Sequence, residues 1–118
     1  IRQLGYQQQL EIFHYLVVKN NFEPIIIDAN DLLDDPKRMI TKLCNKLDIK
    51  FTKRMLLWPA GKRESDGVWG PYWYENVYKS TQFIAPPKKS INLKKSLLPI
   101  YRECLSNYNF LFEKRLKL

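Results

Sequence analysis

One run of β-branched residues, from Pro24 to Asp28, limits most strongly what this chain can fold into. Its three consecutive isoleucines have the composition of a strand that is buried on both faces of a parallel sheet. The backbone N–H and C=O groups of such a strand stay unpaired unless neighbouring strands supply hydrogen-bonding partners. Because the other segments indicate helices and loops, residues 24–28 predict an α/β fold whose remaining strands lie upstream of this chain.

The rest of the sequence is dominated by helical patterns. Apolar residues recur every three or four positions across residues 5–18, which predicts an amphipathic helix that ends at a pair of asparagines. Asp34 or Asp35 followed by Pro36 predicts the capped start of a second helix. A closing helix is expected to follow a cap at Ser96. We therefore expect a mostly helical chain with one strand.

The charge of the chain favours anionic partners. Twenty Lys and Arg residues against twelve Asp and Glu residues give a formal net charge of +8. Such a balance attracts nucleotides, sulfated molecules, nucleic acids or anionic membrane surfaces. The alternative, that the lysines form an ordinary solvated surface, stays open. Charge thus indicates a class of ligand without identifying one.

Cysteine usage and hydropathy indicate the compartment. Cys44 and Cys104 both lie in helical apolar patterns, so they predict buried thiols and a reducing, cytoplasmic environment. The longest apolar runs are too short to span a bilayer, and no signal-peptide pattern is present, so no membrane partner is expected. The sequence opens at Ile1 without an initiator methionine. This opening predicts that an upstream part is missing.

Familiar catalytic and metal-binding patterns are absent from the sequence. His14 is the single histidine, and no serine or cysteine accompanies it at the spacing of a catalytic triad. One histidine and two distant cysteines do not make a zinc site. The aspartates within residues 28–35 lack the glycine and the terminal glutamate of a calcium loop, and we interpret them as helix caps. No metal site is expected, and the sequence identifies no catalytic residue.

A segment from Pro59 to Tyr74 combines glycines, cations and aromatic rings. A guanidinium group can bind phosphate oxygens in a bidentate manner, an ammonium group adds a point charge, and an indole can stack on a purine. The candidate nucleotide-contacting residues in and just after this segment are Lys62, Arg63, Trp69, Trp73 and Lys79. In the alternative interpretation, the rings pack in the core and the cations face solvent.

Motifs in and around this segment resemble the P-loop-like sulfotransferase superfamily. They are Trp58 to Gly61, Asp66 to Trp69, Pro71 to Tyr74 and the pair Ser80-Thr81. The resemblance also covers residues 25–36, as a strand, an acidic turn and the start of a helix. It implies that residues 1–118 form the C-terminal part of one three-layer sulfotransferase domain, with the strand at about 24–28.

The resemblance also implies a donor and a missing partner. Whole members of the family hold the 5′-phosphosulfate of PAPS on a loop near the N-terminus, and this chain has no match to that loop. The implied function is transfer of a sulfuryl group from PAPS to an unidentified small-molecule acceptor. The loop from Gly61 to Trp69 would lie over the nucleotide. We expect the chain to be inactive without the upstream half of the domain.

Two other functions remain open at the level of sequence. The charge of +8 and the many aromatic rings also suit a non-catalytic module that binds single-stranded nucleic acid or another polyanion. Affinity that falls steeply with salt is expected of such a module. A remnant without activity is the third possibility.

Overall fold

The computed structural model describes residues 4–87 and 90–118, which form two compact units. Unit 1 consists of the described residues of Ile1–Asp28 and Pro87–Lys117. Unit 2 consists of Ala29–Pro86 together with Leu118. Within the described ranges, no helix is long and apolar enough to cross a membrane. The prediction that residues 1–118 are part of a single domain stays a prediction.

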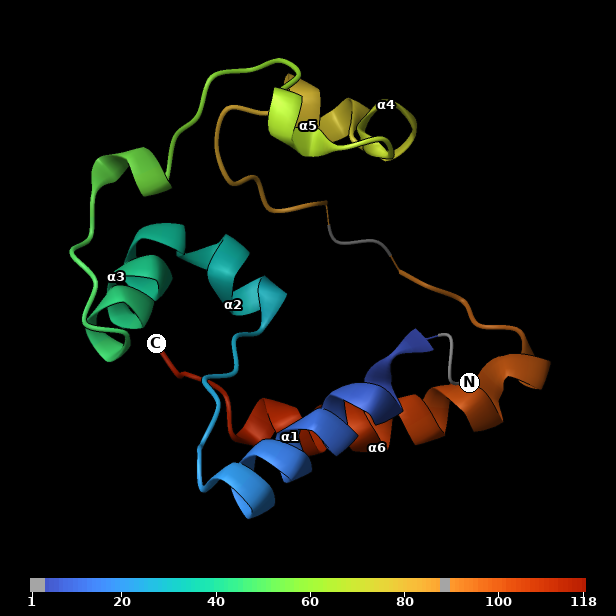
Figure 1. Ribbon diagram of the computed structural model, residues 1–118. Coiled ribbons are helices and arrows are strands. Elements are labelled where there is room, and N and C mark those ends of the chain that lie inside the picture. Colours follow the sequence, from blue (N-terminus) through green and yellow to red (C-terminus); the bar gives the residue numbers. More distant parts are fainter. Residues whose placement is uncertain (1–3, 88–89) are drawn as a thin grey trace. The chain divides into compact units, whose positions relative to one another are not determined.

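Unit 1 is built on two long helices that lie side by side and run in the same direction (Figure 1). They are α1, Tyr6–Asn20, and α6, Leu98–Glu113, and a short 3₁₀ turn, η4 (Lys95–Leu97), precedes α6. The buried ring of Phe13 on α1 meets Phe110 on α6 edge to face at 5.8 Å. The ammonium group of Lys114 lies over both rings. An aromatic contact covered by a cation thus joins the middle of α1 to the C-terminal half of α6.

The predicted boundaries of these helices are only partly confirmed. The helix expected over residues 5–18 is α1, and it ends where Asn21 adopts a left-handed φ of 48° and donates its N–H to Leu16 O. Ser96 was expected to cap the closing helix, but it lies inside η4 and α6 has no side-chain cap. Because the 3₁₀ turn continues to Leu97, that residue and not Ser96 occupies the N-cap position of α6.

The isoleucine segment is where the fold prediction is wrong. No strand or sheet occurs within residues 4–87 and 90–118, so the three-layer α/β fold with a strand at 24–28 is not observed. Pro24 to Ile27 are half-buried residues outside any helix or strand. The N–H of Leu116 donates to Ile26 O at 2.8 Å. A β-branched run signals burial, and here the burial is achieved without a ladder of backbone hydrogen bonds.

A buried carboxylate follows the isoleucines. Asp28 accepts a hydrogen bond from the hydroxyl of Tyr108 on α6 at 2.7 Å. Tyr108 also stacks on Phe112, whose ring is covered by the guanidinium of Arg115 at 3.4 Å. Asp28 had been grouped with the helix-capping aspartates. Its contact with Tyr108 ties the isoleucine segment to α6, across 80 residues of sequence.

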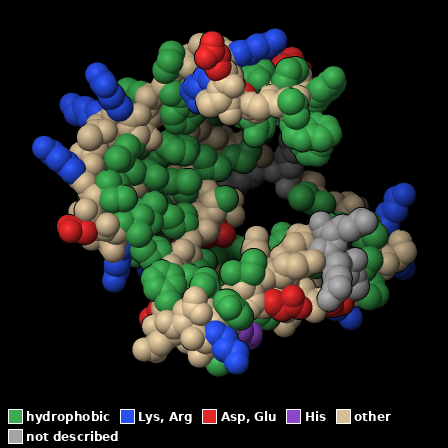
Figure 2. All heavy atoms as spheres, in the orientation of Figure 1, with side chains coloured by type: hydrophobic (Ala, Val, Ile, Leu, Met, Phe, Trp, Pro, Cys, Tyr) green, Lys and Arg blue, Asp and Glu red, His purple; other side chains and the backbone are tan. Residues whose placement is uncertain are grey.

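The aligned helices of unit 1 leave apolar surface open. A hollow of about 520 Å³ lies between the start of α1 and the first turns of α6, and its wall includes Tyr101, Cys104 and Tyr108. On α1, Ile12, Tyr15 and Val18 are exposed. Figure 2 shows hydrophobic side chains at the surface in both units, most densely in unit 2. Only one stripe of α1 is therefore covered by α6.

Unit 2 begins with α2, Ala29–Asp34, and α3, Pro36–Lys46. The predicted cap is confirmed, since Asp35 accepts the N–H of Arg38 at 3.0 Å and Pro36 occupies the first turn of α3. Met39 and Cys44 are the buried residues of α3, and the Cys44 thiol lies 3.6 Å from the sulfur of Met55 in the 3₁₀ turn η2, Lys53–Met55. Unit 2 is thus centred on α3.

Candidate functional site

The five candidate residues all lie on one loop of unit 2, residues 59–80, here called the aromatic loop. Its two ends are held together at the base. Leu57 and Gln82 form an isolated antiparallel bridge, and the N–H of Trp58 donates to Thr81 O at 2.9 Å. The indole N–H of Trp58 donates to Ser80 Oγ at 3.1 Å. The loop therefore begins and ends at a base whose two segments of chain are hydrogen-bonded to each other.

Within the loop the chain turns on glycines and short helices. Gly61 and Gly67 have φ values of 119° and 68°, which L side chains rarely adopt. Between them lies the 3₁₀ turn η3, Glu64–Asp66, whose Asp66 carboxylate accepts the N–H of Arg63 at 2.8 Å. Two short helices follow, α4 (Gly70–Trp73) and α5 (Glu75–Lys79). Pro71 lies in the first turn of α4.

Tyr78 on α5 lies at the centre of the loop. Its carbonyl accepts the N–H of Gly61 at 2.8 Å, and its half-buried ring lies 6.0 Å from the ammonium group of Lys62. Tyr74 meets the ring edge to face at 6.3 Å. The hydroxyl lies against buried Gly70, where an added Cβ would overlap the hydroxyl oxygen. Tyr78 therefore contacts both turns of the loop.

The surroundings of Tyr78 favour its neutral form. Desolvation, then the negative charge of Asp66 and then Tyr74 raise the pKa of Tyr78 above its ordinary value of 10.0. A raised pKa means that the folded loop holds this proton more tightly than the unfolded chain does. The contribution of Tyr78 to stability is therefore fully present below pH 10.0 and is lost as the pH rises through the raised pKa.

We expect this shift to be measurable in an alkaline titration. Subtracting the phenolate absorbance of a Tyr78→Phe variant from that of the original chain isolates Tyr78 among the seven tyrosines. The difference curve is expected to have its midpoint above pH 10.0 in the folded chain and to move down to the ordinary value in denaturant. A folded-state midpoint at or below 10.0 would contradict the described surroundings of Tyr78.

Three aromatic side chains of the loop are not part of a core. Trp69, Tyr72 and Trp73 are 67%, 79% and 76% exposed. Trp69, Trp73 and Tyr74 line a shallow groove of about 360 Å³. The alternative interpretation, in which the rings pack in the core, is wrong for these three residues. Trp58 and Phe83, at the base of the loop, are half-buried and meet edge to face at 5.1 Å. The faces of the three exposed rings are therefore open to solvent.

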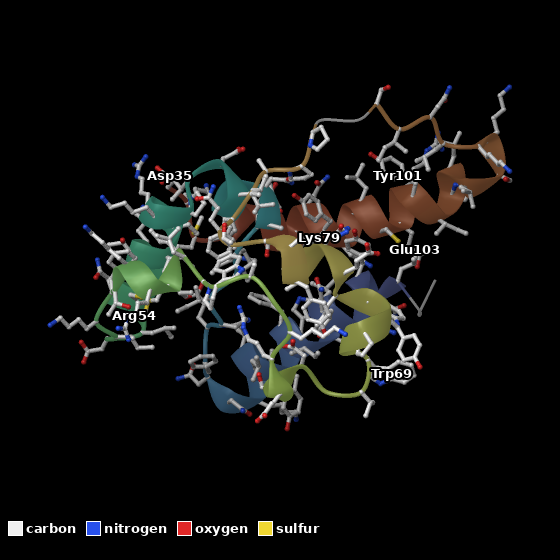
Figure 3. The ribbon with its side chains drawn as sticks, turned by 90° about the horizontal axis from the view of Figure 1, so that it is seen from above. Asp35, Arg54, Trp69, Lys79, Tyr101 and Glu103 are labelled. Carbon is white, nitrogen blue, oxygen red and sulfur yellow. The ribbon has the colours of Figure 1, made fainter. Side chains whose placement is uncertain are left out.

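The candidate cations differ in their partners. Lys79 forms an exposed ion pair with Glu75 at 2.7 Å, so part of its charge is already neutralised. Lys62 and Arg63 form no ion pair with any residue that the structure describes. Figure 3 shows Trp69 and Lys79 on different turns of the loop. The structure thus places Lys62 over the ring of Tyr78, Trp69 and Trp73 on one groove, and Lys79 in an ion pair with Glu75.

Sequence reasoning missed the role of Tyr78 and Gly70. Both were visible as an aromatic and a glycine near a proline, but they lie on two different short helices, α4 and α5, so no periodicity within one element predicts their contact. Only the fold of the loop brings them together.

His14, the single histidine, has a ring that contacts Phe13 and Phe110 edge to face. Among residues 4–87 and 90–118, no group of three His, Cys, Asp or Glu side chains is placed to hold a metal ion.

Comparison with known proteins gives one family and two relatives. Residues 12–108, which include the whole aromatic loop, match the family model described as Sulfotransferase domain. Branched-chain-amino-acid aminotransferase-like protein 2 of Arabidopsis thaliana is 41% identical over 88 residues. Its homologue, aminotransferase-like protein 1 of the same plant, is 40% identical over 88 residues. No solved structure matches this chain.

The two alignments cover most of this chain but only a small part of each relative. Each covers 75% of this chain but only 16% of the relative. The chain therefore spans 16% of the length of the curated relatives it matches. The aminotransferase in their names describes those much longer proteins, and most of their length lies outside the aligned segment.

Proposed function

Because the chain belongs to the sulfotransferase domain family, we propose that its aromatic loop contacts the nucleotide of a sulfuryl donor. The transfer takes place in a longer protein, and the donor is PAPS, which sulfotransferases generally use. One observation carries the proposal: the loop presents two cations without ion-pair partners and a groove lined by exposed indoles. A nucleotide needs both kinds of contact, because cations bind its phosphates and an aromatic surface stacks on its purine.

The chemistry of the transfer explains why cations are needed. The bond between the sulfur and the bridging oxygen of the phosphosulfate breaks, and the phosphate leaves with added negative charge. The acceptor oxygen or nitrogen bonds to sulfur and releases its proton to water. Positive groups placed at phosphate oxygens stabilise that charge. Arg63 supplies a planar fork of donors and Lys62 a point charge. Trp69 and Trp73 hold the adenine by stacking.

Other parts of the transfer lie beyond these residues. No segment of the chain matches the loop that holds the 5′-phosphosulfate in whole sulfotransferases. We therefore assign this chain a supporting share of the donor site and no transfer activity of its own. The acceptor is an uncharacterised small molecule, and its hydroxyl or amine attacks the sulfur. This division of labour is consistent with relatives that are much longer than this chain.

Calorimetry with PAP, the desulfated donor, tests the proposal. Replacing Lys62 or Arg63 with Gln is expected to weaken PAP binding about tenfold each, because each change removes a charge-assisted contact. Lys79→Gln is expected to have a smaller effect, since Glu75 already pairs with Lys79. Lys50→Gln is the matched control, because it removes the same charge from an exposed residue outside the loop. Equal effects of Lys62→Gln and Lys50→Gln would contradict the proposal.

A second function is favoured by a specific observation. Trp69, Tyr72 and Trp73 present three exposed rings within five residues on a chain of charge +8, as in proteins that bind single-stranded nucleic acid by stacking. Tight binding of an oligonucleotide that falls steeply with added salt, together with no binding of PAP, would favour this polyanion-binding module. PAP binding with little oligonucleotide binding would exclude it.

A further inference from the structure

We propose that Tyr78 is the positioning residue of the aromatic loop: it fixes the turn that carries Lys62 relative to the turn that carries Trp69 and Trp73. This inference rests on the proposed function and deepens it. The spacing between a cation and a stacking ring must suit the distance between a phosphate and a base. A residue that sets this spacing therefore controls which anionic aromatic ligand the loop accepts.

The contacts of Tyr78 on the cation side are made by its backbone and its ring. Its carbonyl oxygen accepts the N–H of Gly61 at 2.8 Å, which holds the residue directly before Lys62. The Lys62 ammonium then lies 6.0 Å from the ring centre, within the range of a cation–π contact. At an exposed site such a contact restricts the position of a long side chain more than it stabilises the fold.

The contacts on the indole side are made by the ring and the hydroxyl. The hydroxyl lies against Gly70, which opens α4 and directly follows Trp69. The ring also meets Tyr74, which lines the groove with the two tryptophans. The two turns of the loop have no other described hydrogen bond or ring contact that joins Gly61 or Lys62 to α4. Tyr78 is thus the link between them.

Gly70 shows how closely the two turns approach. A Cβ at this position would overlap the Tyr78 hydroxyl and would lie 3.1 Å from the Cβ of Asp66. The backbone of Gly70 does not have a positive φ, so the requirement for glycine comes from this close approach alone. The negative charge of Asp66 contributes to the raised pKa of Tyr78, in agreement with a hydroxyl that lies near Asp66.

A double-mutant cycle tests the proposal without changing a cation or a tryptophan. Gly70→Ala places a methyl group where the hydroxyl lies and is expected to weaken PAP binding about tenfold, because the ring is displaced. Tyr78→Phe removes the hydroxyl but keeps the ring, so a loss of about twofold or less is expected. The double variant is expected to regain most of the affinity, because the added methyl group then occupies the space of the missing oxygen.

The cycle has outcomes that would overturn the proposal. If the double variant binds PAP as weakly as the product of the two single losses, Tyr78 and Gly70 act independently and the positioning role is wrong. If Gly70→Ala binds PAP as well as the original chain, the close approach does not matter for the ligand and the role is also wrong. Far-ultraviolet circular dichroism of each variant identifies any loss that comes from unfolding.

A readout without ligand separates this inference from the proposed function. If the original chain fails to bind PAP, the proposed function is wrong, but Tyr78 can still be tested by NMR. Amide exchange at Gly61 is expected to accelerate in Gly70→Ala and to return toward the original rate in the double variant, because displacement of Tyr78 weakens the bond to its carbonyl. Exchange that is unchanged in Gly70→Ala would overturn the positioning role, whatever binds to the loop.

Discussion

Replacing Met39 with alanine is expected to lower the free energy of unfolding of unit 2 by about 2–5 kcal/mol. Met39 is 0% exposed and is the one described residue whose large side chain is completely buried. It lies on α3, the helix on which the core of unit 2 is built. Alanine would leave a cavity there, and the lost transfer free energy adds to the cost of that cavity.

Chemical denaturation monitored by NMR signals from each unit measures this effect. Met39→Leu is the matched control, since a swap that conserves volume is expected to cost less than about 1.5 kcal/mol. Signals of α3 should show the loss, and the comparison with α1 and α6 shows whether unit 1 unfolds separately. A cost of Met39→Ala as small as that of Met39→Leu would mean that Met39 does not hold the core of unit 2 together.

Replacing Tyr108 with phenylalanine is expected to destabilise unit 1 by about 1.5–3 kcal/mol, the range for a hydrogen bond to a charged group. The change removes only the hydroxyl that donates to buried Asp28 at 2.7 Å. The stacking of the ring on Phe112 is retained. The loss therefore measures how strongly this hydrogen bond holds the isoleucine segment to α6.

Tyr101→Phe provides the matched control for this variant. Tyr101 is an exposed tyrosine on the same helix, so removal of its hydroxyl is expected to change stability by less than about 0.5 kcal/mol. Thermal and denaturant unfolding of the two variants should therefore differ clearly. Equal stabilities of Tyr101→Phe and Tyr108→Phe would show that the contact with Asp28 contributes little to unit 1.

The sequence predicted best those elements whose signals are local. The start of α3 was predicted because Asp35 and Pro36 determine it by themselves, through a side-chain cap and a fixed φ. The strand at 24–28 was wrong because β-branched composition reports burial and not the presence of a pairing partner. Ser96 was wrong as a cap because the 3₁₀ turn around it depends on how residues 95–97 join α6.

In the candidate site, the residue types could be predicted from the sequence, but their exposure and contacts could not. Cations, glycines and indoles are visible in the sequence, and the family that they indicated is confirmed over residues 12–108. Their exposure was not predictable, because a tryptophan in a sequence fits a core as well as a surface. The contact between Gly70 and Tyr78 was hidden because it depends on the path of the chain between them. The nucleotide contacts of the loop remain predictions.

The division of the chain into a continuous and a discontinuous unit has a consequence for its synthesis. The residues from Ala29 to Pro86 are contiguous, so unit 2 can begin to fold as soon as they have left the ribosome. Unit 1 can form only later, because α1 precedes the residues of unit 2 in the chain and α6 follows them. Until α6 emerges, Phe13 has no Phe110 to cover it and the isoleucines have no Leu116. Until then the nascent chain carries α1 with its apolar stripe uncovered, a surface that a chaperone can recognise.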